Sequence, residues 1–266
     1  MIVAIGSIRR EAAGIIRSRE YTAVKAAEDF AAYQPKSEEY PTIVLSGSGS
    51  ERAARATKWA IQEFSPEAIV SFGFCAATKN YARPGDIVIA ASVIKLPGSP
   101  FEWSIEDEMN SLGPDKTMLL ACRTAVEISG LDFHHGTIVT IEKVATTSGA
   151  KKWLGDAVNA TATDTASHAI ATTASAACIP WAVVCSVIDG RDVNSPKVID
   201  RIGLGPNQRG NMAYIKHVSS TPQDLLALMR LGRSATSANS SLNTFIKAFM
   251  QVHSGLTKAQ QSATSE

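Results

Sequence analysis

The chain has 266 residues, of which 45% are hydrophobic and 19% are charged, as is typical of a globular protein. Its formal net charge of +1 offers no electrostatic attraction for nucleic acid or for an anionic membrane surface. No apolar run approaches the roughly 20 residues of a membrane-spanning helix. The opening MIVAIGSIRRE lacks a basic leader and a full signal-peptide core, so we expect a first strand and a cytoplasmic protein.

Apolar runs and alanine-rich amphipathic segments alternate along the chain. Strands are expected at Ile2–Ile5, Thr42–Leu45, Ala68–Ser71, Ile87–Ala90, Gly136–Thr140 and Trp181–Ile188. Helices are expected at Ser50–Phe64, Lys116–Ile128 and Ala166–Ala177. This alternation is typical of βαβ units and predicts an α/β fold with a mainly parallel or mixed sheet covered by helices on both faces.

The C-terminal region has a different composition. Residues Ser195–Ser219 are rich in Gly, Pro, Asn and Arg and predict a long loop that could cover a site. Thr221 and Pro222 then form a good helix start, and apolar residues recur at helical spacing to about residue 252. We favour a helix that packs on the domain over one that lies on a membrane. The prediction is one domain over 1–253, with its last helix at about 222–252, and a flexible polar tail over 254–266.

The cysteines and histidines show no metal-binding pattern. Cys75, Cys122, Cys178 and Cys185 form no CxxC pair, and each lies in an apolar context, which favours buried, reduced thiols. The five histidines have no HExxH or other ligand spacing, so we predict no metal.

The strand predicted at Trp181–Ile188 stops abruptly at an acid, Asp189, followed by Gly190. Its length and β-branched content are typical of a strand buried on both faces. Because ligands bind at the carboxyl ends of strands in open α/β sheets, Asp189 is a candidate proton donor with a raised pKa. The alternative is an aspartate that caps the next helix or turn.

Three further segments carry candidate site residues. Glu11 follows the first strand, in the first turn of a helix, where it could act chemically or simply complement the helix dipole. The turn Ser46–Ser50, SGSGS, could bring backbone N–H groups to a phosphate, sulfate or sugar, although it lacks the Lys of a P-loop and the full dinucleotide fingerprint. The third segment is Phe72–Ala77, followed by Arg83–Val88, RPGDIV.

In this order and spacing, these segments resemble the nucleoside phosphorylase and nucleosidase superfamily. The resemblance runs from Met1 to about Asp192, and its landmarks are Glu11, the S-G-x-G turn, the segment leading to P-G-D-I-V, and the strand that ends in Asp189. Within the superfamily, the chain most resembles the hopanoid-associated phosphorylase group. Asp164–Ala169, DTASHA, is similar to that group's D-M-E-S-H-A, and Pro222–Arg233 is similar to its C-terminal helix.

The resemblance implies a single-domain three-layer α/β/α sandwich with a central mixed sheet that cleaves an N-glycosidic bond. It implies that Asp189 protonates N7 of a departing purine and that Glu11 activates water, as in methylthioadenosine nucleosidase relatives. In phosphorylases, an anion would instead sit in the Gly-rich turn near Ser46, Ser48 and Arg9 or Arg10. The substrate-binding residues implied are Ser46, Gly47, Ser48, Gly73, Phe74, Cys75, Val144, Ala145, Thr165 and Ala166.

The resemblance further implies a small nucleoside-like substrate, a homo-oligomer and no cofactor, with phosphate left open as a co-substrate. Nucleic acid is not expected as a partner. Peripheral membrane contact is left open, although nothing in the sequence indicates it.

One departure from the superfamily pattern concerns the sugar. Ala166 stands where a glutamate normally grips the ribose hydroxyls, and losing two charge-assisted hydrogen bonds would cost on the order of 3 kcal/mol or more. Phe74, Ala76 and Ala77 also replace small Ser and Gly residues. Asp164 or His168 could supply a substitute contact, although both are expected to face elsewhere.

Three hypotheses follow. The first is an enzyme that cleaves a purine from a modified, even lipid-linked, adenosine by water or phosphate, with an apolar mouth formed by Ser195–Ser219 and the C-terminal helix. The second is a non-catalytic relative that binds a nucleoside-like ligand or a protein, as Ala166 suggests. The third is an unrelated α/β enzyme such as a Rossmann-like oxidoreductase. This hypothesis is disfavoured because the sequence lacks the acidic residue that follows a GxGxxG motif in dinucleotide-binding proteins.

Overall fold

The computed structural model describes residues 1–17, 21–26, 30–37, 39–96, 111–195 and 223–263. Within these residues the chain forms a nine-stranded sheet in the order β2-β3-β4-β1-β5-β8-β7-β6-β9. The strands are β1 (Ile2–Gly6), β2 (Tyr21–Val24), β3 (Ala31–Pro35), β4 (Thr42–Leu45), β5 (Ala68–Ala77), β6 (Ile87–Lys95), β7 (Phe133–Thr140), β8 (Ala160–Asp164) and β9 (Trp181–Asp189).

The sheet closes on itself around β5. This strand runs parallel to β1 and β9, and its last residues pair antiparallel with β8. Because β8 continues through β7 and β6 back to β9, the strands β5-β8-β7-β6-β9 form a ring. Ala76 of β5 is opposite both Thr163 of β8 and Asp189 of β9. The carboxyl ends of three strands therefore meet at one place.

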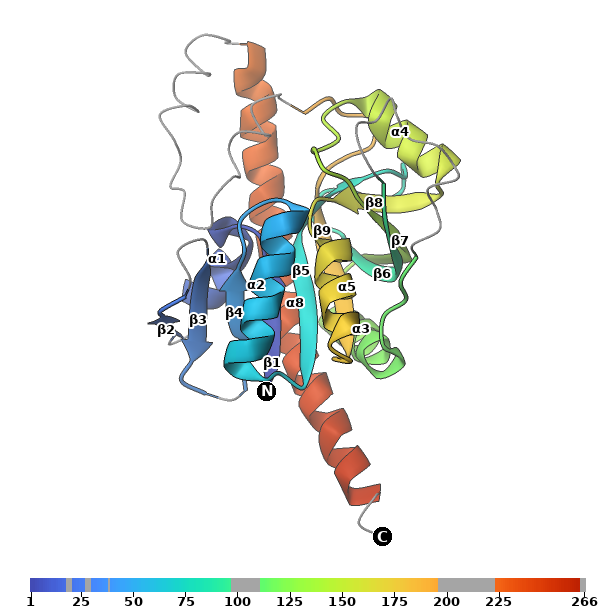
Figure 1. The fold of residues 1–266 in the computed structure, drawn as a ribbon. Coiled ribbons are helices and arrows are strands. Elements are labelled where there is room, and N and C mark those ends of the chain that lie inside the picture. The colour runs from blue at the N-terminus through green and yellow to red at the C-terminus, as the bar shows by residue number, and fades with distance from the viewer. Residues whose placement is uncertain (18–20, 27–29, 38, 97–110, 196–222, 264–266) are drawn as a thin grey trace.

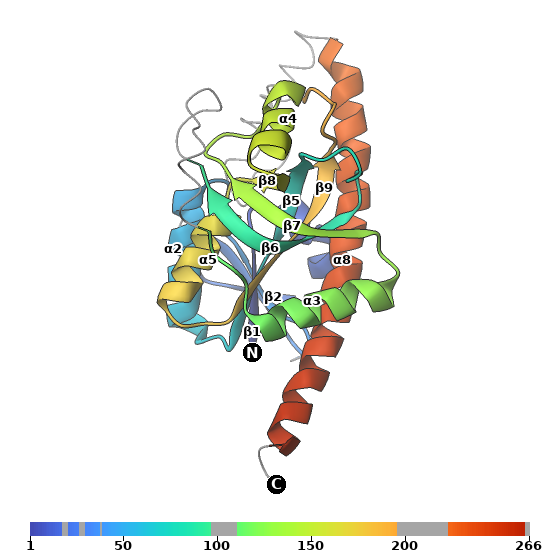
Figure 2. The ribbon, with the colours of Figure 1, turned by 90° about the vertical axis from the view of Figure 1, so that its right-hand side faces the viewer.

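Helices cover both faces of the sheet, as Figures 1 and 2 show. One face packs against α1 (Arg9–Arg17), α3 (Lys116–Ser129) and α8 (Gln223–Ala263), and the other against α2 (Ser50–Phe64) and α5 (Ser167–Ala176). In β1, Ile2 and Ala4 join the first core while Val3 and Ile5 join the second, as expected for a strand buried on both faces. The predicted three-layer fold with a mixed sheet is confirmed.

Some elements were absent from the sequence prediction. The prediction found α2 at its observed bounds but missed β2, β3, β8 and α4 (Ser148–Ala157). It placed Glu11 in the first turn of a helix but gave no bounds for α1. The strand β2 is only half buried at the sheet edge, and β8, ATATD, is too short and polar to stand out as an apolar run. Their pairing with longer strands stabilises them, rather than their own composition.

The last helix is longer than predicted. Instead of ending near residue 252, α8 continues to Ala263, so most of the predicted polar tail is helical. Leu242, Phe245 and Phe249 anchor its middle in the core, while the helix extends beyond the sheet at both ends (Figures 1 and 2). The predicted Thr221–Pro222 start and the loop from residue 196 to Ser219 lie outside the described residues. Of the helices described, none is long and apolar enough to span a membrane.

Two of the cysteines were predicted wrongly as reduced thiols. Cys75 and Cys185 lie on the adjacent strands β5 and β9, face the same core and form a disulfide with their Cα atoms 5.8 Å apart. Cys122 is free and buried, as expected, whereas the free Cys178 is exposed. The separation of 110 residues between the paired cysteines explains why sequence spacing gave no sign of the bond.

The seating of α4 on the sheet depends on a glycine. A Cβ atom at Gly155 would lie 2.1 Å from the backbone oxygen of Thr78, whereas one at Gly149 in the same helix meets no described atom within 4 Å. We expect Gly155→Ala to lower the free energy of unfolding by about 1–3 kcal/mol, because the helix must shift. Gly149→Ala should leave it unchanged or slightly raised. Urea denaturation of the two variants tests this, and equal stabilities would contradict it.

Candidate active site

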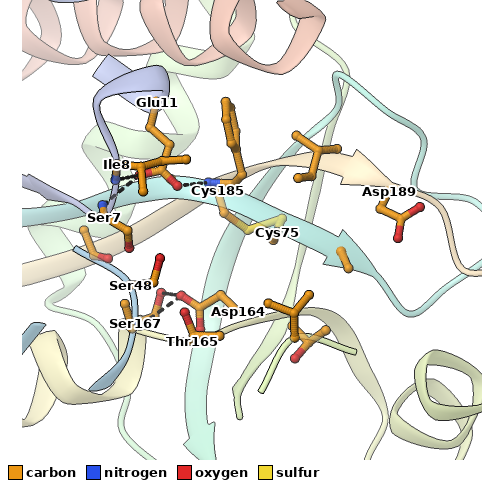
Figure 3. A pocket seen from close by; sticks show the side chains of 18 of the residues that line it. Ser7, Ile8, Glu11, Ser48, Cys75, Asp164, Thr165, Ser167, Cys185 and Asp189 are labelled. Carbon is orange, nitrogen blue, oxygen red and sulfur yellow. Dashed lines mark hydrogen bonds between the residues drawn. A yellow bond between two sulfur atoms is a disulfide. The ribbon is translucent and has the colours of Figure 1, made fainter. Parts of the chain in front are cut away.

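A cavity of about 150 Å³ opens where β5, β8 and β9 end (Figure 3). Its lining comes from segments far apart in the chain. The N-terminal part contributes β1, the start of α1, the Gly-rich turn and β5. The remainder contributes the loop before α4, β8 with the start of α5, β9, and Leu231 of α8. Three carboxyl groups line it, those of Glu11, Asp164 and Asp189. Lys, Arg and His are absent from the described lining.

Glu11 is buried in the first turn of α1 and is held by backbone groups. The N–H groups of Ser7 and Ile8 donate to its Oε2 at 2.7 and 2.9 Å, and the N–H of Phe74 donates to Oε1 at 3.0 Å. A Cβ at Gly73 would lie only 3.0 Å from Oε1, so the glycine lets β5 approach the carboxyl group. Glu11 therefore accepts hydrogen bonds at the start of its helix and also faces the cavity. The structure is thus compatible with both a chemical role and a helix-stabilising role for Glu11.

The pKa of Glu11 is raised from 4.5 to about 7. Burial is the main cause, the negative charge of Asp164 adds to it, and the three backbone hydrogen bonds oppose it. A carboxyl group with a pKa near 7 can accept and release protons at neutral pH, as a general base requires.

The helix α8 fixes the position of α1. The side-chain amide of Asn239 donates to the carbonyl oxygens of Arg10 and Glu11 at 2.7 and 2.9 Å, and Arg10 donates to the carbonyl of Gly232 at 2.9 Å. The C-terminal helix therefore holds the backbone that carries Glu11, more than 200 residues away in the chain.

Asp189 is the last residue of β9 and lies in a network with a buried lysine. Lys151 of α4 donates to Asp189 Oδ2 at 2.7 Å, and the hydroxyl of Ser195 donates to the same oxygen. Burial raises the pKa of Asp189, while the nearby ammonium group opposes the rise. Burial also lowers the pKa of Lys151. The described residues give Asp189 no helix-capping role.

Asp164 ends β8 on the opposite wall of the cavity from Glu11 (Figure 3). Its Oδ1 accepts from the Thr140 hydroxyl at 2.7 Å, and its Oδ2 accepts from the backbone N–H and the hydroxyl of Ser167. Burial raises its pKa and these bonds oppose the rise. The expectation that Asp164 faces elsewhere was wrong, because it belongs to a strand and not to the helix that follows. His168, by contrast, is not among the residues that line the cavity.

The structure brings most of the predicted site residues together. The cavity is lined by Glu11, Ser48, Gly73, Phe74, Cys75, Val144, Ala145, Thr165, Ala166 and Asp189. Figure 3 places the Cys75–Cys185 disulfide between Glu11 and Asp189.

Of the side chains predicted near an anion, only Ser48 lines the cavity. Ser46 is fully buried, and its hydroxyl donates to the carbonyls of Gly6 and Gly47. Gly47 does not line the cavity, and its N–H donates to the Ser7 carbonyl. Arg9 lies over the ring of Tyr33 at 5.8 Å, and Arg10 is bonded to α8.

Lys151 is the main site residue that the sequence prediction missed. A faint signal exists, because Lys151 shares one buried helical face with Leu154 and Gly155. A lysine on such a face needs a buried acidic partner, but only the fold identifies Asp189 as that partner. The described residues contain no group of three His, Cys, Asp or Glu side chains placed to hold a metal.

Comparison with known proteins identifies the family. The family model of the phosphorylase superfamily matches residues 1–203. The chain belongs to the phosphorylase superfamily. This confirms the resemblance seen in the motifs, while the hopanoid-associated subgroup stays a prediction. No curated protein matches the sequence.

Solved structures share the fold of this superfamily member. A 5′-methylthioadenosine/S-adenosylhomocysteine nucleosidase from Neisseria meningitidis, in complex with methylthio-immucillin-A, has a TM-score of 0.71 and 18% identity, over 93% of this chain and 97% of that one. A nucleosidase of the same description from Colwellia psychrerythraea, in complex with adenine, has a TM-score of 0.70 and 16% identity, over 94% of both chains. A futalosine hydrolase mutant from Helicobacter pylori has a TM-score of 0.67 and 13% identity, over 92% and 97%.

The raised pKa of Glu11 makes stability depend on pH. Its contribution to the free energy of unfolding is fully present below the unfolded-state pKa of 4.5 and is lost as the pH rises through about 7, because the buried carboxyl must then ionise. Between about pH 5 and pH 8 the wild type should lose about 3 kcal/mol more stability than Glu11→Gln. Urea denaturation at each pH measures this, with the exposed Glu51→Gln as the control. Parallel pH profiles for the wild type and Glu11→Gln would contradict it.

Proposed function

We propose that this member of the phosphorylase superfamily is a hydrolase that cleaves the N-glycosidic bond of a purine nucleoside, with water as the nucleophile. The observation that carries the proposal is the cavity itself: Glu11 and Asp189 share it, and its described lining has three carboxyl groups and no cationic side chain. Nucleosidases from other organisms with the same fold support it.

The two carboxyl groups would have separate roles. Asp189 would donate a proton to the purine as the C–N bond breaks and its electron pair moves to the base. Glu11 would take a proton from the water that attacks the sugar. An acid and a base that flank the scissile bond are the arrangement of inverting glycoside hydrolysis. The raised pKa values of both groups suit these roles, since Asp189 must hold a proton and Glu11 must exchange one near neutral pH.

Water is favoured over phosphate on electrostatic grounds. A phosphate dianion in this cavity would lie near the carboxyl groups of Glu11 and Asp164, with no Lys, Arg or His side chain in the described lining to offset its charge. The nearby Lys151 is already paired with Asp189. The Gly-rich turn offers no compensation from Ser46, whose hydroxyl is bonded to backbone carbonyls. A neutral water molecule carries no such penalty.

The finer expectation of a lipid-linked adenosine stays a prediction. Leu231 of α8 lines the cavity, and Leu226 and Met229 of the same helix are exposed apolar side chains, which would suit an apolar substituent on the sugar. Most of the predicted apolar mouth lies outside the described residues. A non-catalytic ligand-binding protein is the second candidate, favoured by the alanine at position 166 on the cavity wall.

The first test is adenine release from adenosine, 5′-methylthioadenosine and a 5′-apolar adenosine analogue, in buffers with and without phosphate. We expect release without phosphate and, in H₂¹⁸O, one labelled oxygen in the released sugar. Release that requires phosphate would contradict the proposal. Folded protein that binds adenine but cleaves none of the substrates would favour the ligand-binding alternative.

Substitutions test the proposed roles of Glu11 as the base and Asp189 as the acid. Glu11→Gln and Asp189→Asn should each reduce turnover by on the order of 100-fold or more, since each removes one proton transfer. Asp192→Asn is the matched control, because Asp192 is an exposed acid near the end of β9 that does not line the cavity.

Position 166 offers a test of sugar recognition. Ala166 leaves the cavity wall without a carboxylate at this point, so adenosine and 2′-deoxyadenosine should be cleaved with similar kcat/KM. Ala166→Glu would add an acceptor for the vicinal hydroxyls and should favour adenosine by on the order of 10-fold or more. Ala166→Gln, of similar size but uncharged, should have a smaller effect. An unchanged preference in folded Ala166→Glu would contradict this role.

A further inference from the structure

Lys151 is a fully buried lysine that the proposed chemistry does not itself require. It extends from α4 toward the end of β9, and its ammonium group has three acceptors. These are Asp189 Oδ2 at 2.7 Å, the carbonyl of Gly190 at 2.7 Å and the carbonyl of Val193 at 2.6 Å. An ammonium group has three hydrogens to donate, so all three are used, and Lys151 has none left for a substrate.

The hydrogen bonds to Asp189 fall on one side of its carboxyl group. Lys151 and the hydroxyl of Ser195 both donate to Oδ2. Oδ1 receives no hydrogen bond from the residues that the structure describes, and Asp189 lines the cavity. A carboxyl group fixed in this way has one oxygen bound by the protein and the other left for a ligand.

We propose that Lys151 is the positioning residue for the general acid: it fixes Oδ2 of Asp189 so that Oδ1 carries the proton to the departing base. This rests on the proposed function. The same lysine holds the carbonyls of Gly190 and Val193, so it also sets the path of the chain directly after the acid.

The charge of Lys151 assists the proton transfer itself. When the Oδ1 proton moves to the base, the C–N bond breaks and Asp189 becomes a carboxylate. The ammonium group, already 2.7 Å from Oδ2, compensates that charge without any rearrangement. The proton that Glu11 takes from water returns to Asp189 through solvent, so the cycle balances.

A purely structural role is the alternative, because a buried lysine with three acceptors could serve only to hold α4 on the sheet. The two roles differ in their dependence on the leaving group. Adenine needs a proton to depart, whereas 4-nitrophenolate is a stable anion that leaves without one. A positioning residue for the acid affects the first reaction and spares the second, whereas a structural residue affects both.

The test compares Lys151→Met with the adjacent Lys152→Met on adenosine and on 4-nitrophenyl β-ribofuranoside. Lys152 is half exposed and pairs with Asp192 at 3.0 Å, so it controls for the loss of a lysine in the same helix. We expect Lys151→Met to reduce kcat for adenine release by on the order of 100-fold, with nitrophenolate release changed less than about 3-fold. Lys152→Met should leave both reactions near wild type.

Two further measurements guard the test. Should Lys151→Met fail to fold by circular dichroism, Ser195→Ala, which removes the other donor to Oδ2, should show the same selectivity at a smaller size, of roughly 3- to 10-fold. The second measurement is the affinity of each variant for adenine by calorimetry, which does not require that the wild type cleave a nucleoside. Adenine should bind Lys151→Met more weakly than it binds Lys152→Met. If Lys151→Met does not fold, Ser195→Ala takes its place in this comparison.

Equal losses on the two substrates in folded protein would overturn the role of Lys151, as would unchanged adenine release. If the wild type releases neither product, the proposed function fails, and the adenine affinities then decide the role of Lys151: weaker binding supports it, and equal binding overturns it.

Discussion

The site depends on β5, which pairs with β9 along most of its length and with β8 at its carboxyl end, and so closes part of the sheet into a ring. That closure brings the ends of three strands to one cavity lined by three carboxyl groups, of which Glu11 and Asp189 are buried and Asp164 is half-buried. Burying an ionisable group is costly unless it is hydrogen-bonded or paired. Much of the surrounding structure provides those bonds.

Each carboxyl group is satisfied in a different way. Glu11 accepts from three backbone N–H groups, Asp164 from two hydroxyl groups and a backbone N–H, and Asp189 from an ammonium group and a hydroxyl group. Different environments give similar side chains different proton affinities, which suits the acid and base roles proposed for Asp189 and Glu11. Asp164 has both oxygens hydrogen-bonded to its neighbours, and its negative charge makes a small addition to the rise in the pKa of Glu11.

The C-terminal helix links the periphery of the molecule to this cavity. Through Asn239 it holds the backbone of Glu11, and through Leu231 it contributes to the cavity wall. Its buried middle, around Phe245 and Phe249, fixes it to the sheet. The family model ends at residue 203, so these contacts come from a part of the chain beyond the matched region.

The sequence by itself determined the features that local pattern encodes. Apolar runs and helical periodicity gave the α/β class and the bounds of α2, and an abrupt change from apolar strand to acid marked Asp189. Glu11 was found because it directly follows a strand. Only the tertiary structure decided the partners: Lys151 for Asp189, Cys185 for Cys75, and the backbone N–H of Phe74 for Glu11. These pairs are separated by tens to more than a hundred residues, and β8 forms only against its neighbours. The physical reason is that local pattern reports which face of an element is buried, whereas a contact between elements depends on how the whole sheet pairs.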